Sequence, residues 1–185
     1  MTKVSIASLI LAGGQSSRLG QDKALIPVRG VPLLRYVCDV ALQCTPTVCI
    51  VTAWPERYEH IVPANCRLIR EIPDHVQSSF SQRKTASHGP LVGFAQGLAQ
   101  LETDWTLLLA CDLPHLQSQV LQLWIEQLAQ VPTSAIALLP RHAKGWEPLC
   151  GFYRSSARSS LNAFIEQGGR SAQGIRVRTS ANTIR

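Results

Sequence analysis

The sequence lacks the patterns that mark several large classes of protein. It has no run of about 18 apolar residues and no basic segment followed by a long apolar core at its N-terminus, so we expect neither a membrane span nor a secretory signal. Aromatic residues make up only 6% of the chain, and the basic residues are scattered, which argues against a nucleic-acid platform. We therefore expect a cytoplasmic protein that binds neither membranes nor nucleic acid.

The six cysteines include no CxxC pair. This spacing argues against a zinc site and against a disulfide framework, and most of these residues lie within apolar runs, as buried thiols do. They are Cys38, Cys44, Cys49, Cys66, Cys111 and Cys150. Cys111 stands out because it adjoins Asp112, a candidate metal ligand, although its place at a strand end also suits ordinary packing.

The composition is typical of one globular domain. The chain has 185 residues, of which 45% are hydrophobic and 16% charged, and this length supports a single sizeable core. We expect one domain spanning residues 1–185. The formal net charge of +6 is consistent with a substrate that carries several phosphates.

Apolar runs alternate with helical periodicity along the whole chain. This alternation predicts a three-layer, Rossmann-like α/β fold with a mostly parallel mixed sheet, leaving room for one antiparallel strand late in the chain. Ligands of such sheets bind beyond the carboxyl ends of the strands, where Gly13 and Thr52 would both lie. The strands are expected at 4–11, 47–51, 66–69, 105–112, 134–139 and 147–154, and the helices at 33–43, 57–61, 89–101, 117–130 and 155–167.

A glycine loop with two cations follows the first expected strand. Gly13 and Gly14 lack a β carbon and allow a ligand to approach the backbone N–H groups, and Arg18 and Lys23 add positive charge nearby. The stretch contains neither GxxxxGK[ST] nor GxGxxG, so a plain turn remains the alternative to a phosphate loop. We favour a nucleoside triphosphate site.

Asp112 ends the most strongly apolar expected strand, 105–112. An uncompensated charge is costly at such a position, and a bound cation would compensate it. The alternative is that Asp112 caps the helix expected at 117–130, but Pro114 and the residues around it make the distance too long for a simple N-cap. We expect a Mg²⁺ ligand, because Mg²⁺ binds carboxylate and phosphate oxygens while keeping several waters.

Three motifs resemble those of the molybdenum cofactor guanylyltransferases, the molybdopterin-guanine dinucleotide biosynthesis protein A family. LAGGQSSRLGQDK at residues 11–23 resembles the signature LAGGxSxRMGxDK, GPLVG at 89–93 resembles GPLAG, and ACDLP at 110–114 resembles CDxP. The resemblance implies a nucleotidyltransferase that uses GTP and molybdopterin bearing molybdenum as substrates. Other proteins that make or receive the molybdenum cofactor are implied as further partners.

The resemblance also implies which residues form the site. It assigns Mg²⁺ and nucleotide phosphates to Asp112, and nucleotide contacts to the loop residues Leu11, Ala12, Gly13 and Gly14. In role terms, we expect Lys23 at the α-phosphate, Arg18 beside the leaving pyrophosphate and Asp112 on the metal. These three are the catalytic candidates.

Two candidate nucleotide-binding positions depart from the family pattern. Thr52 stands where asparagine is common after the second long strand, and Glu71 stands where aspartate is common after the third. Both can hydrogen-bond a base or ribose, but they leave open a relative that uses CTP or a sugar phosphate. A nucleotide-binding accessory protein without catalysis is the remaining alternative, although it could dispense with Lys23 or Asp112.

Several other segments have no assigned role. Residues 72–88 form a long stretch without periodicity, which is either mobile or functional. Gly93 and Gly97 weaken the helix expected at 89–101, which indicates close packing on the sheet or contact with a ligand. His142 and Lys144 either lie on a solvated loop or face the second substrate.

Overall fold

The computed structural model describes residues 4–13, 21–72, 89–143, 145–169 and 181–183. Within these ranges the chain builds a seven-stranded sheet in the order β11-β7-β10-β6-β1-β4-β5. Its strands are β1 (Ile6–Leu11), β4 (Thr47–Thr52), β5 (Cys66–Arg70), β6 (Trp105–Ala110), β7 (Ala137–Leu139), β10 (Cys150–Arg154) and β11 (Ala181–Thr183). The long helices are α1 (Leu33–Leu42), α2 (Pro90–Leu98), α3 (Ser118–Gln127) and α4 (Ala157–Glu166).

The sheet is parallel except at β10, which runs antiparallel to both β6 and β7. The chain passes from β1 through α1 to β4 and β5 on one side of β1, and then returns through α2 to β6 on the other side. The switch between these directions lies between β1 and β6, the point at which ligands bind to open α/β sheets. The expected mixed, mostly parallel sheet with one late antiparallel strand is confirmed.

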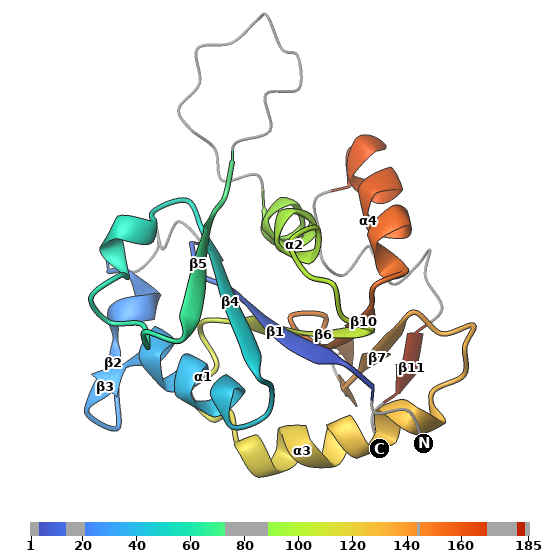
Figure 1. The fold of residues 1–185 in the computed structure, drawn as a ribbon, viewed down its shortest axis with the longest axis horizontal. Helices are drawn as coiled ribbons and strands as arrows, with labels where there is room; N and C mark the ends of the chain where they lie inside the picture. Colours follow the sequence, from blue (N-terminus) through green and yellow to red (C-terminus); the bar gives the residue numbers. More distant parts are fainter. Residues whose placement is uncertain (1–3, 14–20, 73–88, 144, 170–180, 184–185) are drawn as a thin grey trace, which may run out of the picture.

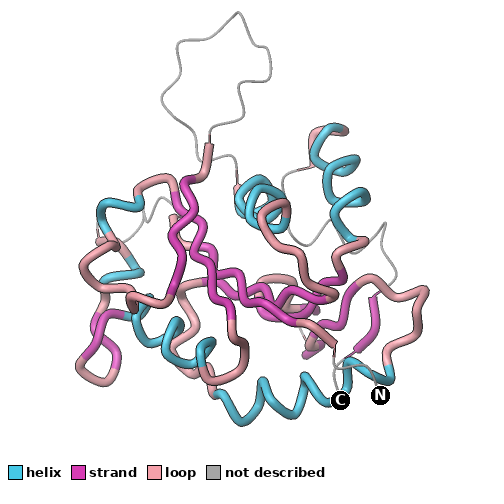
Figure 2. The backbone as a smooth tube through the Cα atoms, viewed as in Figure 1, coloured by secondary structure: helices cyan, strands magenta, loops and turns pink. Residues whose placement is uncertain are grey.

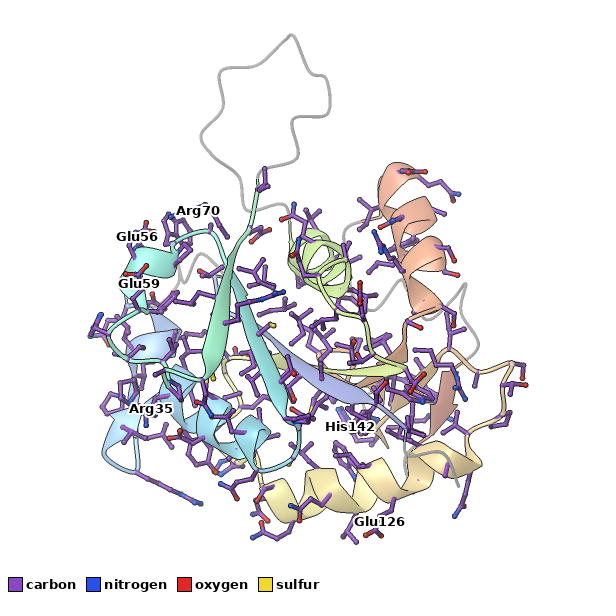
Figure 3. All side chains as sticks on the ribbon, viewed as in Figure 1. Arg35, Glu56, Glu59, Arg70, Glu126 and His142 are labelled. Atoms are coloured by element: carbon purple, nitrogen blue, oxygen red, sulfur yellow. The ribbon has the colours of Figure 1, made fainter. Side chains whose placement is uncertain are left out.

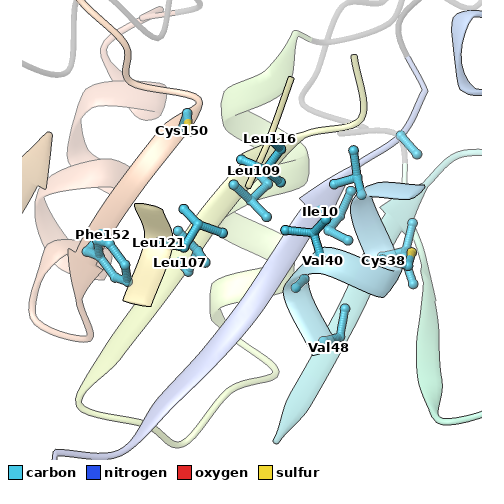
Figure 4. Packing of buried hydrophobic residues seen from close by; sticks show 14 of the residues in the cluster. Ile10, Cys38, Val40, Val48, Leu107, Leu109, Leu116, Leu121, Cys150 and Phe152 are labelled. Carbon is cyan, nitrogen blue, oxygen red and sulfur yellow. The ribbon is translucent and has the colours of Figure 1, made fainter. Parts of the chain in front are cut away.

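Helices cover both faces of the sheet, with α1 and α3 on one face and α2 and α4 on the other (Figure 1, Figure 2). Because successive strand residues point to opposite faces, Leu9 packs in the α2–α4 cluster and Ile10 in the α1–α3 cluster. Figure 4 shows part of the α1–α3 cluster, where strand residues such as Ile10 meet helix residues such as Val40. The three-layer architecture is therefore confirmed.

Short elements fill the connections. Two 3₁₀ turns, η1 (Lys23–Leu25) and η2 (Pro55–Arg57), follow β1 and β4, and a third, η3 (Leu128–Gln130), extends α3. Two small hairpins are β2 (Pro27–Val28) with β3 (Val31–Pro32), and β8 (Arg141–His142) with β9 (Gly145–Trp146). None of the helices in the described part of the chain has the length and apolarity needed to cross a bilayer.

Some local expectations were wrong. No α-helix covers residues 57–61. The chain instead makes tight turns around Tyr58, in which Glu59 N–H donates to Pro55 O and Ile61 N–H donates to Tyr58 O. So short a polar segment cannot nucleate a helix without further support. The β8–β9 hairpin and β11 were not expected, since strands of two or three residues are too short to show alternation. All six cysteines are free thiols, of which Cys38, Cys49 and Cys150 are buried.

Gly93 and Gly97 serve different purposes in α2. A β carbon on Gly97 would lie 2.6 Å from both Leu9 methyl carbons and 2.8 Å from Val51 Cγ2, and Leu9 is fully buried. On Gly93 it would meet Val51 Cγ1 at 3.4 Å and the Glu71 carboxyl carbon at 3.6 Å, ordinary contacts. Gly97 therefore brings α2 close to the sheet, while Gly93 faces the end of β5.

Alanine at these two glycines should have different effects on stability. Gly97→Ala should lower the free energy of unfolding by about 1–3 kcal/mol, because buried Leu9 and Val51 must move. Gly93→Ala, the matched control on the same helix, should leave it unchanged or raise it by up to about 1 kcal/mol through better helix propensity. Urea unfolding monitored by circular dichroism measures both, and equal effects would contradict this packing account.

Candidate functional site

A cleft of about 280 Å³ opens at the carboxyl ends of β1 and β6. The two strands pair in parallel with Leu11 opposite Ala110, and Cys111 N–H extends the ladder by donating to Leu11 O over 3.1 Å. Residues that follow these strands therefore leave the same edge of the sheet. The described residues that line the cleft are Leu11, Ala12, Gly13, Asp22, Lys23, Val51, Glu71, Gly89, Pro90, Gly93, Ala110, Cys111, Asp112 and Leu149.

Lys23 and Asp112 meet at this cleft although 89 residues separate them. Lys23 Nζ donates a hydrogen bond to Asp112 Oδ2 over 3.0 Å, and each side chain is 44% exposed. Asp112 does not cap α3, since Gln117 occupies the N-cap position. An ammonium group has three donors, so Lys23 can keep this bond and still bind an anion in the cleft.

Gly13 carries the backbone from β1 into the cleft. Its φ of 156° is a conformation that other residues rarely adopt, and a β carbon there would lie 3.7 Å from Thr52 Oγ1 and Ala53 N. Thr52 is fully buried behind it, and its hydroxyl accepts a hydrogen bond from Trp54 N–H over 3.2 Å. Thr52 therefore supports the wall of the cleft without lining it.

The opposite wall comes from the end of β5 and the start of α2. Glu71 extends the β4–β5 ladder by donating its N–H to Thr52 O over 2.7 Å, and its carboxyl group lies against Gly93. Gly89, with φ 83°, precedes Pro90 at the first turn of α2, and no side chain caps this helix. The first N–H groups of a helix have no acceptor within the helix, and the helix dipole is positive at this end, so the start of α2 favours an anion in the cleft.

Cys111 lines the cleft, and the carboxylates of Asp112 and Asp22 act on its thiol. Burial raises the pKa of Cys111 to about 12, and the negative charges of Asp112 and Asp22 add to the rise. The group therefore stays protonated at neutral pH. A protonated thiol is a poor metal ligand, so any metal at this edge would depend on oxygen ligands.

The structure brings together most of the residues that the motifs indicated. Leu11, Ala12, Gly13, Lys23, Glu71 and Asp112 all line the cleft. Gly14 and Arg18 lie outside the described residues, as do the stretch 73–88 and Lys144. His142 does not line the cleft; its Nε2 pairs with Glu147 Oε1 at 2.5 Å, with both side chains about half exposed (Figure 3).

Sequence reasoning missed several lining residues. Gly89 and Pro90 belong to the GPLVG motif, and the signal was the glycine-proline pair before a helix. Gly93, for which contact with a ligand was one of two expectations, also lines the cleft. Asp22 was also missed. It precedes the η1 turn, where aspartate commonly caps the following backbone N–H groups.

The donor set suits a divalent cation that takes few protein ligands. Within the described ranges no group of three or more His, Cys, Asp or Glu residues could hold a metal. Asp112, by contrast, presents a half-exposed carboxylate at the cleft, with Lys23 bonded to one of its oxygens. Mg²⁺ commonly binds through one or two carboxylates, with substrate phosphates and waters completing the shell, so these residues fit that ion.

Comparisons with known proteins identify the family of the chain. A family model described as the MobA-like NTP transferase domain matches residues 8–180. A probable molybdenum cofactor guanylyltransferase from Nostoc sp. is 56% identical over 169 residues, covering 91% of this chain and 75% of that protein. A protein of the same description from Synechococcus elongatus is 38% identical over 171 residues, covering 92% of this chain and 83% of that protein.

Solved structures show the same fold. The crystal structure of molybdopterin-guanine dinucleotide biosynthesis protein A from Archaeoglobus fulgidus superimposes with a TM-score of 0.73 at 21% sequence identity, covering 96% of this chain and 82% of that one. The sequence match over nearly the whole chain and the shared architecture support one conclusion. The chain belongs to the family of MobA-like NTP transferase domains, and it is a nucleotidyltransferase.

Proposed function

We propose that this protein transfers GMP from GTP to molybdopterin bearing molybdenum, giving the guanine dinucleotide form of the cofactor and pyrophosphate. The observation that carries the proposal is the meeting of Lys23 and Asp112 at 3.0 Å across the cleft at the switch point. The names of the relatives, guanylyltransferases of the molybdenum cofactor, indicate the substrates. We propose that residues 1–185 act as a single domain in this reaction.

The reaction needs alignment and charge neutralisation more than a protein nucleophile. An oxygen of the acceptor's terminal phosphate, ionised at neutral pH, attacks the α-phosphorus of GTP. The bond between that phosphorus and the oxygen bridging to the β-phosphorus breaks, and pyrophosphate leaves with that oxygen. Preorganised cations lower the barrier because negative charge develops on the phosphoryl oxygens.

Each catalytic candidate has a role in this scheme. Lys23 binds an α-phosphate oxygen, for which its ammonium has donors left after bonding Asp112. Asp112 holds Mg²⁺, which supplies charge neutralisation on the phosphates when bound. We propose that Arg18 binds the leaving pyrophosphate through its guanidinium fork.

The walls of the cleft suggest where the nucleoside lies. We propose that the backbone of Leu11, Ala12, Gly13 and Gly14 contacts the nucleotide near the guanine. Glu71 lines the cleft and is suited to accept hydrogen bonds from guanine or from ribose hydroxyls. Thr52 contributes from behind Gly13, because its buried hydroxyl holds the turn after β4.

We place the reaction in the cytoplasm, with molybdenum cofactor biosynthesis or acceptor proteins as further partners. Six free thiols are consistent with a reducing compartment.

Nucleotide choice and metal dependence test the proposal together. With molybdopterin and Mg²⁺ present, pyrophosphate release should be faster with GTP than with CTP, and it should stop on removal of the divalent ion with EDTA. Release should also require molybdopterin. Faster turnover of CTP, or of a sugar phosphate as acceptor, would assign the chain to a related transferase instead.

Loss of Lys23 should abolish most activity while leaving the fold intact. Lys23→Ala should lower kcat/KM for GTP by about 100-fold or more, the usual effect of losing one charge-stabilising donor. The free energy of unfolding should change by less than about 1 kcal/mol, because the Lys23–Asp112 pair is 44% exposed on both sides and such pairs are weakly stabilising.

Arg35→Ala is the matched control for Lys23→Ala. Arg35 pairs with Asp39 on α1 at 3.0 Å, with side-chain exposures of 42% and 43% (Figure 3). Its loss should match Lys23→Ala in stability but leave turnover unchanged. If Lys23→Ala kept turnover within a few-fold of wild type, the catalytic role proposed for Lys23 would be wrong.

A further inference from the structure

The carboxylate of Asp22, directly before Lys23, is bonded from two directions. Asp22 Oδ1 accepts a hydrogen bond from Ala24 N–H over 3.0 Å, and Asp22 Oδ2 accepts one from the Tyr58 hydroxyl over 2.7 Å. The first bond caps η1, the turn that begins at Lys23. The second reaches the connection between β4 and β5, 36 residues away.

Tyr58 is a rigid anchor for this carboxylate. Its side chain is 1% exposed and belongs to the α1–α3 core cluster. The turns around it are closed by backbone bonds from Ile61 N–H and Val62 N–H to Tyr58 O, each over 3.0 Å. Burial raises the pKa of Tyr58, and the Asp22 carboxylate raises it further, so the hydroxyl is a donor throughout the neutral range.

Lys23 needs such an anchor because its own local structure is minimal. It begins a three-residue 3₁₀ turn whose backbone bonds join Leu25 N–H to Asp22 O and Ile26 N–H to Lys23 O, over 3.0 and 3.3 Å. So short a turn has poor hydrogen-bond geometry and little stability of its own. A lysine side chain also has many rotamers, so its own conformation does not fix the position of the ammonium group. The position then depends on where the backbone of Lys23 is held.

We propose that Asp22 and Tyr58 are positioning residues, which hold the η1 turn so that the Lys23 ammonium stays at Asp112 and at the phosphate site. This inference rests on the role proposed for Lys23. Asp22 faces the cleft, but both of its oxygens are already bonded to this chain.

A double-mutant cycle tests whether Tyr58 acts through Lys23. Tyr58→Phe removes only the hydroxyl group and should lower kcat for nucleotidyl transfer by about 5- to 20-fold, with a smaller change in the KM for GTP. Added to Lys23→Ala, the same substitution should cost less than about twofold, because the lysine that it positions is absent. Effects that multiply in full would overturn the proposal.

Ser8→Ala is the matched control for the lost hydrogen bond. Ser8 Oγ and Thr45 Oγ1 bond at 2.7 Å and are both buried, and neither lines the cleft. This variant should lose about as much stability as Tyr58→Phe, because each loses one buried or half-buried hydrogen bond, with no change in kcat. An equal fall in kcat in both variants would mean that Tyr58 acts only through stability.

A second measurement keeps this inference separate from the proposed function. Amine acetylation of the protein without nucleotide, followed by peptide mass spectrometry, reports the reactivity of Lys23 even if wild-type protein transfers no GMP. Tyr58→Phe should change the acetylation rate of Lys23 at least twofold, and Ser8→Ala should not. An unchanged rate in Tyr58→Phe would overturn the positioning role whatever reaction the site performs.

The same series separates positioning from metal binding. Asp22→Asn keeps a carbonyl oxygen for Ala24 N–H and should retain more activity than Asp22→Ala, at an unchanged Mg²⁺ requirement. A raised Mg²⁺ requirement in Asp22→Asn, together with a normal kcat in Tyr58→Phe, would identify Asp22 as a metal ligand and contradict the proposal.

Discussion

The parallel pairing of β1 with β6 is the constraint on which the rest of the site depends. Neighbouring parallel strands end at the same edge, and the register that places Leu11 opposite Ala110 brings the residues after both strands into one cleft. The two strands are neighbours because the chain adds β4 and β5 on one side of β1 and then returns to place β6 on the other side. Lys23 and Asp112 consequently meet at 3.0 Å without contributing much to stability, since each is nearly half exposed.

Glycine and buried polar groups shape this cleft in complementary ways. Gly13 and Gly93 leave space at its two walls, whereas Thr52 keeps the turn behind Gly13 in place with its hydroxyl. Gly97, one helical turn beyond Gly93, lets α2 pack on Leu9 and so brings the start of that helix to the cleft. The space for a ligand and the close packing of the core therefore depend on the same short helix.

The two aspartates at the cleft differ in what surrounds them. Asp22 has both oxygens bonded to this chain, one to Ala24 N–H and one to Tyr58. Asp112 is 44% exposed, and one of its oxygens bonds the ammonium of Lys23. A carboxylate whose oxygens are taken suits a fixed structural role, and one that remains accessible suits a ligand that arrives with the substrate.

The sequence by itself determined the fold class, the order of the main elements and the family, because apolar periodicity and three short motifs are local properties of the chain. It also indicated Gly13, Lys23 and Asp112, through a glycine loop with nearby cations and a carboxylate at the end of an apolar strand. It did not reveal the bond from Tyr58 to Asp22, the burial of Thr52 or the separate duties of Gly93 and Gly97. Only the tertiary structure decided these three features. Each depends on a contact between segments that are far apart along the chain, and such a contact leaves no pattern in the sequence near either residue.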